Sequence, residues 1–163
     1  MGIKEILDFV RKSFEEKDAI REEAIRISRN IIRLSKEIIS YIHRDMFKNA
    51  EDRISLIEEN VLELNKKARE LGEIYYSGIV RDSLMEYVEA ILFYNIIVKN
   101  NVILLKNVPM TSYILGLADL TGEIRRKMKY WGLDVYYDIE LLNPEEAVEK
   151  AIKLAIKHQK KYG

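Results

Sequence analysis

Two glutamates, Glu86 and Glu89, stand three residues apart in an apolar stretch of the sequence. Residues at this spacing share one face of a helix. No lysine or arginine lies one helical turn from either glutamate along the chain, so burial would remove hydration from two like charges that lack a counter-ion. Mg²⁺ or Mn²⁺, which prefers oxygen ligands, would relieve both costs. A structural role stays open, because Ser83 to Glu86 also fits a capping box and Glu89 could face solvent.

A second acidic pair, Asp119 and Glu123, stands four residues apart in the segment Gly-Leu-Ala-Asp-Leu-Thr-Gly-Glu. Both residues again share a helix face. The two glycines of this segment, Gly116 and Gly122, each cost about 1 kcal/mol relative to alanine inside a helix, so close approach of another helix is expected to compensate. Glu123 could form an ion pair with Arg126 or Lys127, whereas Asp119 has no such neighbour, which favours a functional role for the pair.

Four carboxylates that hold one or two Mg²⁺ ions could hydrolyse a phosphodiester bond. The metal would polarise a phosphoryl oxygen and lower the pKa of a bound water. No serine, cysteine or histidine nucleophile competes with this interpretation: the chain has no cysteine, and neither histidine has a paired acid at a diagnostic spacing. The four candidates for both metal binding and catalysis are Glu86, Glu89, Asp119 and Glu123.

Basic residues recur at steps of three and four along one predicted helix, which could follow a phosphate backbone. The alternative is an ordinary solvated face, since acidic residues dilute the charge nearby. Two arginines shortly after Glu123 are candidates for holding the scissile phosphate. The candidate nucleic-acid-binding residues are Arg26, Arg29, Arg33, Lys36, His43, Arg125 and Arg126.

The composition excludes several classes of protein. Lys+Arg and Asp+Glu both number 27, so the chain is not a generic cationic binder of nucleic acid. The absence of cysteine excludes disulfides and thiolate metal sites and fits the cytoplasm. The first residues do not form a cleavable signal peptide, and the most apolar stretch, 90–105, is too short and too polar to span a bilayer. We therefore expect a soluble, cytoplasmic protein.

The hydrophobic periodicity predicts an all-α, single-domain antiparallel bundle of about seven helices over residues 1–163. Leu133 to Leu142 is the one segment predicted to be irregular. Asn143, Pro144 and Glu146 form a strong helix-start signal. The predicted helices cover residues 3–14, 18 to about 41, 52–71, 73–80, a buried central helix at 83–105, 111–130 with Gly132 at its end, and 143 to about 161.

Three segments resemble the translin family. Gly116 to Arg126 is similar to the family's Asp-Leu-Thr-Gly-Glu signature, and Met85 to Ala90 is similar to a Glu-Tyr-Val-Glu-Ala stretch of Trax. The third consists of Ile27 to Arg29 followed by Ile42 to Arg44. The resemblance implies a seven-helix fold, a hollow octamer, binding of single-stranded nucleic acid and, in the Trax-like branch, a Mg²⁺-dependent endoribonuclease. The family's acidic site residues fall on Glu86, Glu89, Asp119 and Glu123, which favours the catalytic branch. Because one chain carries both the acids and a basic helix, a homo-oligomer is expected. The chain is shorter than the animal proteins, and Lys127 to Tyr130 fits neither branch.

Two other functions remain open. A non-catalytic module could bind single-stranded RNA or DNA through the basic helix. An all-α nucleoside triphosphate pyrophosphohydrolase also holds Mg²⁺ with Glu-x-x-Glu and a second acidic pair, although the second pair here has four-residue spacing where that family usually has three. A di-iron bundle is excluded, because neither histidine has a glutamate three residues before it.

Overall fold

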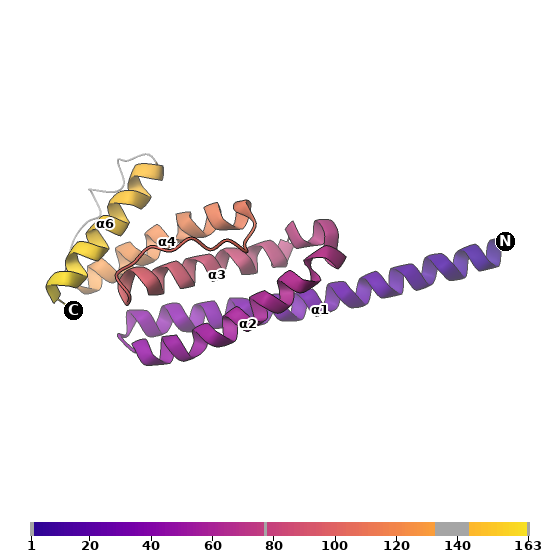
Figure 1. Cartoon of the computed structure of the whole chain (residues 1–163), viewed down its shortest axis with the longest axis horizontal. Coiled ribbons are helices and arrows are strands. Elements are labelled where there is room, and N and C mark those ends of the chain that lie inside the picture. Colours follow the sequence, from indigo (N-terminus) through magenta and orange to yellow (C-terminus); the bar gives the residue numbers. More distant parts are fainter. Residues whose placement is uncertain (1, 77, 133–143, 163) are drawn as a thin grey trace.

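The computed structural model describes residues 2–76, 78–132 and 144–162, and these residues form helices joined by short connections (Figure 1). No β-strand occurs in these ranges, which confirms the all-α prediction. None of the described helices has both the length and the apolar composition that a bilayer crossing requires. The elements are α1 (Ile3–His43), α2 (Phe47–Leu71), the 3-10 helix η1 (Gly72–Tyr76), α3 (Gly78–Ile97), α4 (Met110–Tyr130) and α6 (Pro144–Tyr162).

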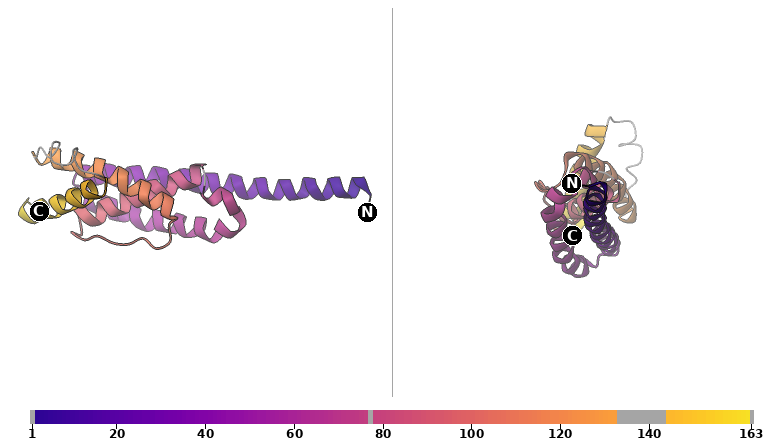
Figure 2. Two further views of the ribbon diagram at one scale, coloured as in Figure 1. Left: turned by 90° about the horizontal axis from the view of Figure 1, so that it is seen from above. Right: turned by 90° about the vertical axis from the view of Figure 1, so that its right-hand side faces the viewer.

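Five α-helices and one 3-10 helix therefore stand in the described residues where about seven helices were predicted. The two helices predicted at 3–14 and after Asp18 are one continuous helix, α1. No glycine or proline lies between Ile3 and His43, so nothing in the chain interrupts the helical hydrogen bonds. Its C-terminal half packs in the bundle, and its N-terminal half projects away from it (Figures 1 and 2).

The buried central helix is confirmed as α3, which contacts α1 on one side and α4 on the other. Its predicted limits of 83–105 are wrong, as is a helix at 73–80. Gly72 and Gly78 adopt positive φ angles of 54° and 52°, so η1 is separated from α3 and α3 begins five residues earlier than expected. Asn100, at φ 54°, follows the end of the helix at Ile97, and residues 98–109 run on without regular structure.

Gly116 allows α4 to lie directly against α3. A Cβ atom at Gly116 would stand 2.7 Å from both the Met85 carbonyl oxygen and the Val88 Cβ. The expected close approach of another helix is therefore confirmed at this glycine. It is wrong for Gly122, because a Cβ atom there would meet nothing within 4 Å. The contact at Gly116 fixes how α4 is placed along α3. It therefore also fixes where Glu123 lies relative to Glu86 and Glu89 of α3.

The last two predicted helices agree well with the structure. α4 begins at Met110 and ends at Tyr130, and Gly132 follows with a φ angle of 75°, as expected for a residue just past a helix end. α6 begins with Pro144 in its first turn and packs against α4 and α3. The segment predicted to be irregular, 133–142, and the expected cap Asn143 lie outside the described residues.

Candidate active site

A pocket of about 530 Å³ lies where the C-terminal turns of α1 meet the middle of α3 and the second half of α4. It contains three of the four predicted acidic residues and several of the predicted basic ones. Its walls are formed by Lys36, Ile39, Ser40, His43 and Arg44 of α1 and its end, Glu86 and Glu89 of α3, and Glu123, Arg126 and Tyr130 of α4.

Glu89 is the most buried carboxylate of the pocket, with only 7% of its surface exposed. Among the described residues, neither Glu86 nor Glu89 has a hydrogen-bond or ion-pair partner. Burial, together with the charges of Glu123, Glu86 and Asp119, raises the pKa of Glu89 to about 8. Burial also raises the pKa of Glu86, an effect that Lys36 partly opposes. The structure therefore places two partly or fully desolvated carboxylates in one pocket, and no described lysine or arginine forms an ion pair with either.

The structural alternative for this pair is wrong on both counts. α3 begins at Gly78, so Glu86 lies in its third turn rather than at its start. The Ser83 hydroxyl donates a hydrogen bond to the Val80 carbonyl oxygen at 2.8 Å and caps nothing. Glu89 faces the pocket and not open solvent.

Glu123 is held from two sides. Its Oε2 atom lies 2.5 Å from Nε2 of His43, and its Oε1 atom lies 3.2 Å from Arg126, which confirms the ion pair suggested by the sequence. The His43 ring packs against Phe93 and Tyr130, with ring centroids 5.1 Å and 5.8 Å apart. His43 therefore belongs to the acidic pocket. Sequence reasoning missed this contact because 80 residues separate the two partners.

Lys127 of α4 bonds to the C-terminal end of α1 beside the pocket, a role that the sequence analysis did not predict. It is 1% exposed, and its Nζ donates hydrogen bonds to the carbonyl oxygens of Ile42 at 2.9 Å and His43 at 3.3 Å and to Oδ1 of Asp45 at 2.6 Å. A cation at a helix C-terminus satisfies carbonyl groups that have no helical partner and complements the helix dipole. Asp45 has a φ angle of 58°, so Lys127 also stabilises a strained corner between α1 and α2.

The other two predicted residues of α4 lie near the pocket but not in its walls. Asp119 is exposed one helical turn before Glu123, and its charge contributes to the raised pKa values of Glu86 and Glu89. Arg125 is half-buried and has contacts of its own. The carboxylate oxygens suit a hard divalent cation. In the described part of the chain, however, no three acidic or histidine side chains converge closely enough to hold a metal ion.

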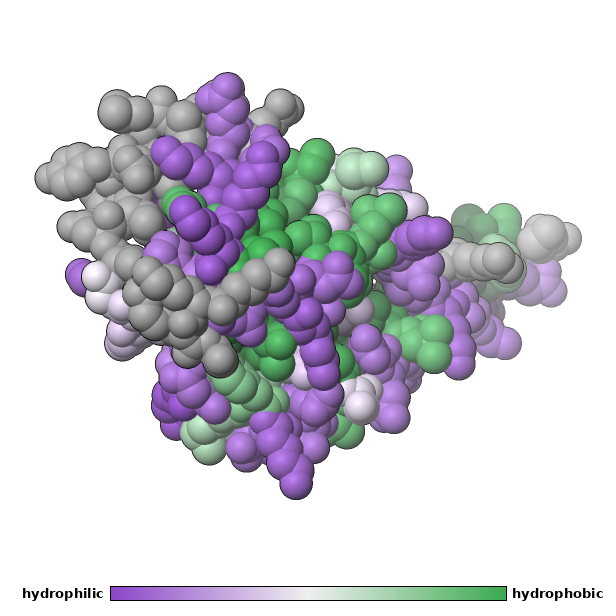
Figure 3. Space-filling model, turned by 60° about the vertical axis from the view of Figure 1, so that its left-hand side comes forward, coloured by the Kyte–Doolittle hydropathy of each residue, from purple (hydrophilic) through white to green (hydrophobic). Residues whose placement is uncertain are grey.

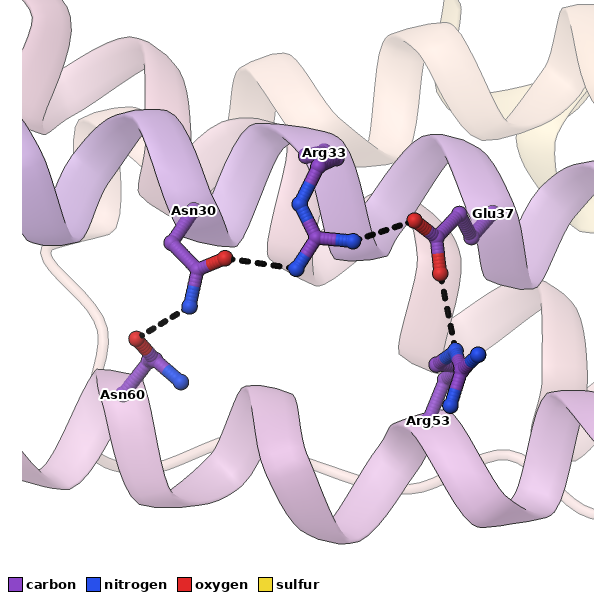
Figure 4. Close-up of polar contacts among 5 residues, drawn as sticks. All are labelled: Asn30, Arg33, Glu37, Arg53 and Asn60. Carbon is purple, nitrogen blue, oxygen red and sulfur yellow. Dashed lines mark hydrogen bonds and ion pairs between the residues drawn. The ribbon is translucent and has the colours of Figure 1, made fainter.

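The predicted basic residues of α1, here called the basic stripe (Arg26, Arg29, Arg33, Lys36 and His43), divide into two groups. Arg26 lies 3.9 Å from Glu63 of α2. Arg33 pairs with Glu37 and donates a hydrogen bond to Asn30 at 2.7 Å, and Figure 4 shows these contacts within a polar network between α1 and α2. Glu37 in turn accepts a hydrogen bond from Arg53 at 2.8 Å. These two arginines are therefore occupied by local contacts.

The remaining basic residues form a line that leads into the pocket. Arg29, Lys36 and His43 follow one another at seven-residue steps, which places them along one side of α1. Arg29 is exposed and has no ion-pair partner among the described residues. Lys36 lines the pocket, and its charge partly opposes the rise in the pKa of Glu86 that burial causes.

The family model for the translin family matches residues 19–128, which contain all four acidic residues and every residue that lines the pocket except Tyr130. This chain belongs to the translin family.

Two curated relatives are similar in sequence. An uncharacterised protein of Methanocaldococcus jannaschii is 32% identical over 126 residues, which is 75% of this chain and 55% of that protein. The translin-associated protein X homologue of Schizosaccharomyces pombe is 32% identical over 139 residues, which is 76% of this chain and 60% of that protein. The matched region thus spans less than two thirds of the length of each relative.

Solved structures of C3PO share the fold. The crystal structure of apo-NeC3PO matches with a TM-score of 0.72 at 20% identity, covering 96% of this chain and 94% of that one. AfC3PO matches with a TM-score of 0.68 at 26% identity, covering 95% and 93%, and a second structure with the same scores contains AfC3PO in complex with duplex RNA.

Proposed function

We propose that this protein is a metal-dependent endoribonuclease of the Trax-like branch that cleaves single-stranded RNA by phosphodiester hydrolysis. The observation that carries the proposal is Glu89, a buried carboxylate that shares its pocket with Glu86 and Glu123 and has a pKa raised to about 8. Such an arrangement destabilises the folded protein unless it serves a ligand. The similarity to a translin-associated protein X homologue and to an RNA-binding C3PO supports the same reading.

Each residue has a definite task in this mechanism. Glu86, Glu89 and Glu123 would hold Mg²⁺ or Mn²⁺, with Asp119 at the rim. When bound, the ion would supply a polarised phosphoryl oxygen and an acidified water. His43 fixes the carboxylate of Glu123 through the Nε2 contact. Arg126 lines the pocket beside Glu123 and can bind a phosphate oxygen.

The RNA would reach the pocket along α1. Arg29 and Lys36 are exposed on the side of the helix that ends at His43, at a spacing of seven residues. Phosphate contacts of this kind position a strand without reading its sequence. Arg26, which lies 3.9 Å from Glu63 of α2, and Arg33, which is bonded to Asn30 and Glu37 of α1 itself, contribute less. Arg125 remains a proposed phosphate contact near the rim.

We also propose that the chain acts as a homo-oligomer, an octamer by resemblance to its family. One chain carries both the acidic pocket and the basic line, so a second type of subunit is not needed to supply either.

A non-catalytic role in binding single-stranded RNA or DNA is the second candidate, and one observation favours it. Glu123 is already engaged by His43 and Arg126, and Asp119 stands outside the pocket, so the carboxylates do not yet form a metal site. Metal-dependent catalysis requires the Arg126 contact to give way to the cation. A binding module requires no such change.

The deciding experiment incubates the purified protein with labelled single-stranded RNA, with Mg²⁺ or with EDTA, beside Glu89→Gln and Glu123→Gln. We expect metal-dependent cleavage by the wild type and a loss of at least a hundredfold in both variants. Glu59→Gln, which removes an exposed carboxylate of α2, is the matched control. Cleavage that survives in both site variants would contradict the proposed nuclease site in the acidic pocket. Metal-independent binding of RNA without cleavage would support the binding module. The same assay with a duplex RNA tests the preference for single strands. The assay with a free nucleoside triphosphate tests whether the protein is a pyrophosphohydrolase.

A further inference from the structure

The ring of Tyr130 lies at the mouth of the acidic pocket with most of its surface in solvent. Tyr130 lines the pocket, yet the residue is 71% exposed. Its ring contacts the ring of His43, which in turn contacts the fully buried ring of Phe93. The three rings thus form a series that leads from the core to the surface. Tyr130 is held on its inner side by a ring contact and presents free aromatic surface outward.

Two cationic side chains flank this ring. Arg126 precedes Tyr130 by four residues on α4 and shares its side of the helix, and Lys129 directly precedes it. Among the described residues, these three border a second hollow of about 410 Å³. Arg126 and Tyr130 line both this hollow and the acidic pocket, so the two spaces adjoin each other at the ring. Lys129 is exposed and forms no ion pair with any residue that the structure describes.

An exposed aromatic ring beside cationic side chains is suited to an unpaired nucleotide. The base stacks on the ring, and the phosphates contact the cations. Figure 3 brings forward the end of the bundle at which α1 and α4 end, and on the described surface there hydrophilic side chains surround smaller apolar areas. Such a surface suits a charged strand better than an apolar protein surface.

We propose that Tyr130 stacks on the base of a nucleotide next to the scissile phosphate, and that this contact makes the protein select unpaired RNA. The inference rests on the proposed function, which places the scissile phosphate in the acidic pocket. The adjoining phosphate would lie beside Arg126 and Lys129. A base within a duplex is paired and already stacked on its neighbours, so it cannot lie on the ring. Every base has an aromatic face, so the contact distinguishes single strands from duplexes without reading their sequence.

Photo-cross-linking tests the contact without requiring cleavage. A single-stranded RNA that carries iodouracil in place of uracil couples on irradiation, with loss of iodine, to an aromatic ring on which the base is stacked. We expect irradiation in EDTA to attach the RNA to Tyr130, which mass spectrometry of the digested protein identifies. Cross-links at other residues alone, or no cross-link, would overturn the proposal.

The RNA affinity of three variants separates stacking from a structural role. Tyr130→Leu keeps an apolar side chain over His43 but removes the ring, so it should bind single-stranded RNA at least about fivefold more weakly. Tyr130→Phe keeps the ring and should bind within about twofold of the wild type. Tyr76→Leu is the matched control and should have no effect. Tyr76 is 63% exposed and packs edge-on against Tyr75, but it belongs to η1, at the other end of the bundle from the end of α4 (Figure 1).

The affinity for a duplex RNA completes the test. Tyr130→Leu should leave this affinity unchanged, so the preference of the protein for single strands should fall by the factor lost on the single strand. An unchanged affinity for single strands, an equal loss for both RNAs, or an equal loss in Tyr130→Phe would each overturn the proposal. Cleavage in Mg²⁺ is measured on the same samples. A wild type that cross-links through Tyr130 but does not cleave counts against the nuclease alone, and one that cleaves without this cross-link counts against the stacking alone.

Discussion

The buried carboxyl of Glu89 makes the stability of the metal-free protein depend on pH. Its pKa in the folded protein is about 8, against 4.5 for the ordinary side chain, so between these values the folded state binds a proton that the unfolded state has released. Stability should therefore fall as pH rises from about 5 to about 8, by on the order of 1 kcal/mol or more. Urea unfolding in EDTA at several pH values measures this. Glu89→Gln should flatten the dependence, and an equally steep curve in that variant would show that another group is responsible.

Lys127 shows what a single buried cation contributes to the same site. Replacing it by methionine keeps the aliphatic packing but leaves two carbonyl oxygens at the end of α1 without their donor. We expect Lys127→Met to lower the free energy of unfolding by about 1–3 kcal/mol. The exposed Lys129, two residues further along α4, is the matched control, and Lys129→Met should change stability by less than about 0.5 kcal/mol. Equal effects in urea unfolding would contradict the bonding role of Lys127.

At the scale of the helix, the two glycines of α4 are expected to respond in opposite ways to the same change. Gly116→Ala places a methyl group 2.7 Å from Met85 and Val88 atoms and should destabilise the protein by about 1–3 kcal/mol. Gly122→Ala meets nothing and should stabilise α4 by up to about 1 kcal/mol. Thermal unfolding of the two variants measures both signs. A fully stable Gly122→Ala protein that no longer binds RNA would show that a ligand approaches α4 there.

The helices that sequence periodicity predicted best are those that a partner helix covers along one side. α4 was predicted almost to the residue, and α3 was correctly expected to be buried at the centre. The prediction failed where an apolar pattern ends without a proline or glycine. Residues 98–105 continue the apolar composition of α3, yet the helix ends at Ile97 and Asn100 adopts a left-handed conformation. The stop lies in the asparagine itself: asparagine, like glycine, can end a helix in the left-handed conformation, and the Asn101 N–H then donates a hydrogen bond to the Asn95 carbonyl oxygen at 3.0 Å.

At the scale of the whole molecule, the site joins residues that local sequence patterns cannot connect. The pairs Glu86 with Glu89 and Asp119 with Glu123 were found because three- and four-residue spacings are local. That Glu123 meets His43 depends on how α1 and α4 cross, 80 residues apart in the chain. The division of the basic stripe likewise depends on where α2 lies. The sequence thus predicts which residues share a helix face, and the packing of helices decides which faces meet.

The balanced charge of the whole chain leads to a last prediction about RNA binding. With 27 basic and 27 acidic residues, the molecule offers no long-range attraction to RNA, so affinity must come from a few local contacts. The slope of log affinity against log salt should be shallow, and Arg29→Ala and Lys36→Ala should each reduce it by roughly 0.7, the value of one phosphate contact on a single strand. Arg26→Ala is the control, because that side chain is turned towards Glu63. If all three variants reduced the slope equally, the RNA would contact the whole stripe of α1 rather than the line that ends in the acidic pocket.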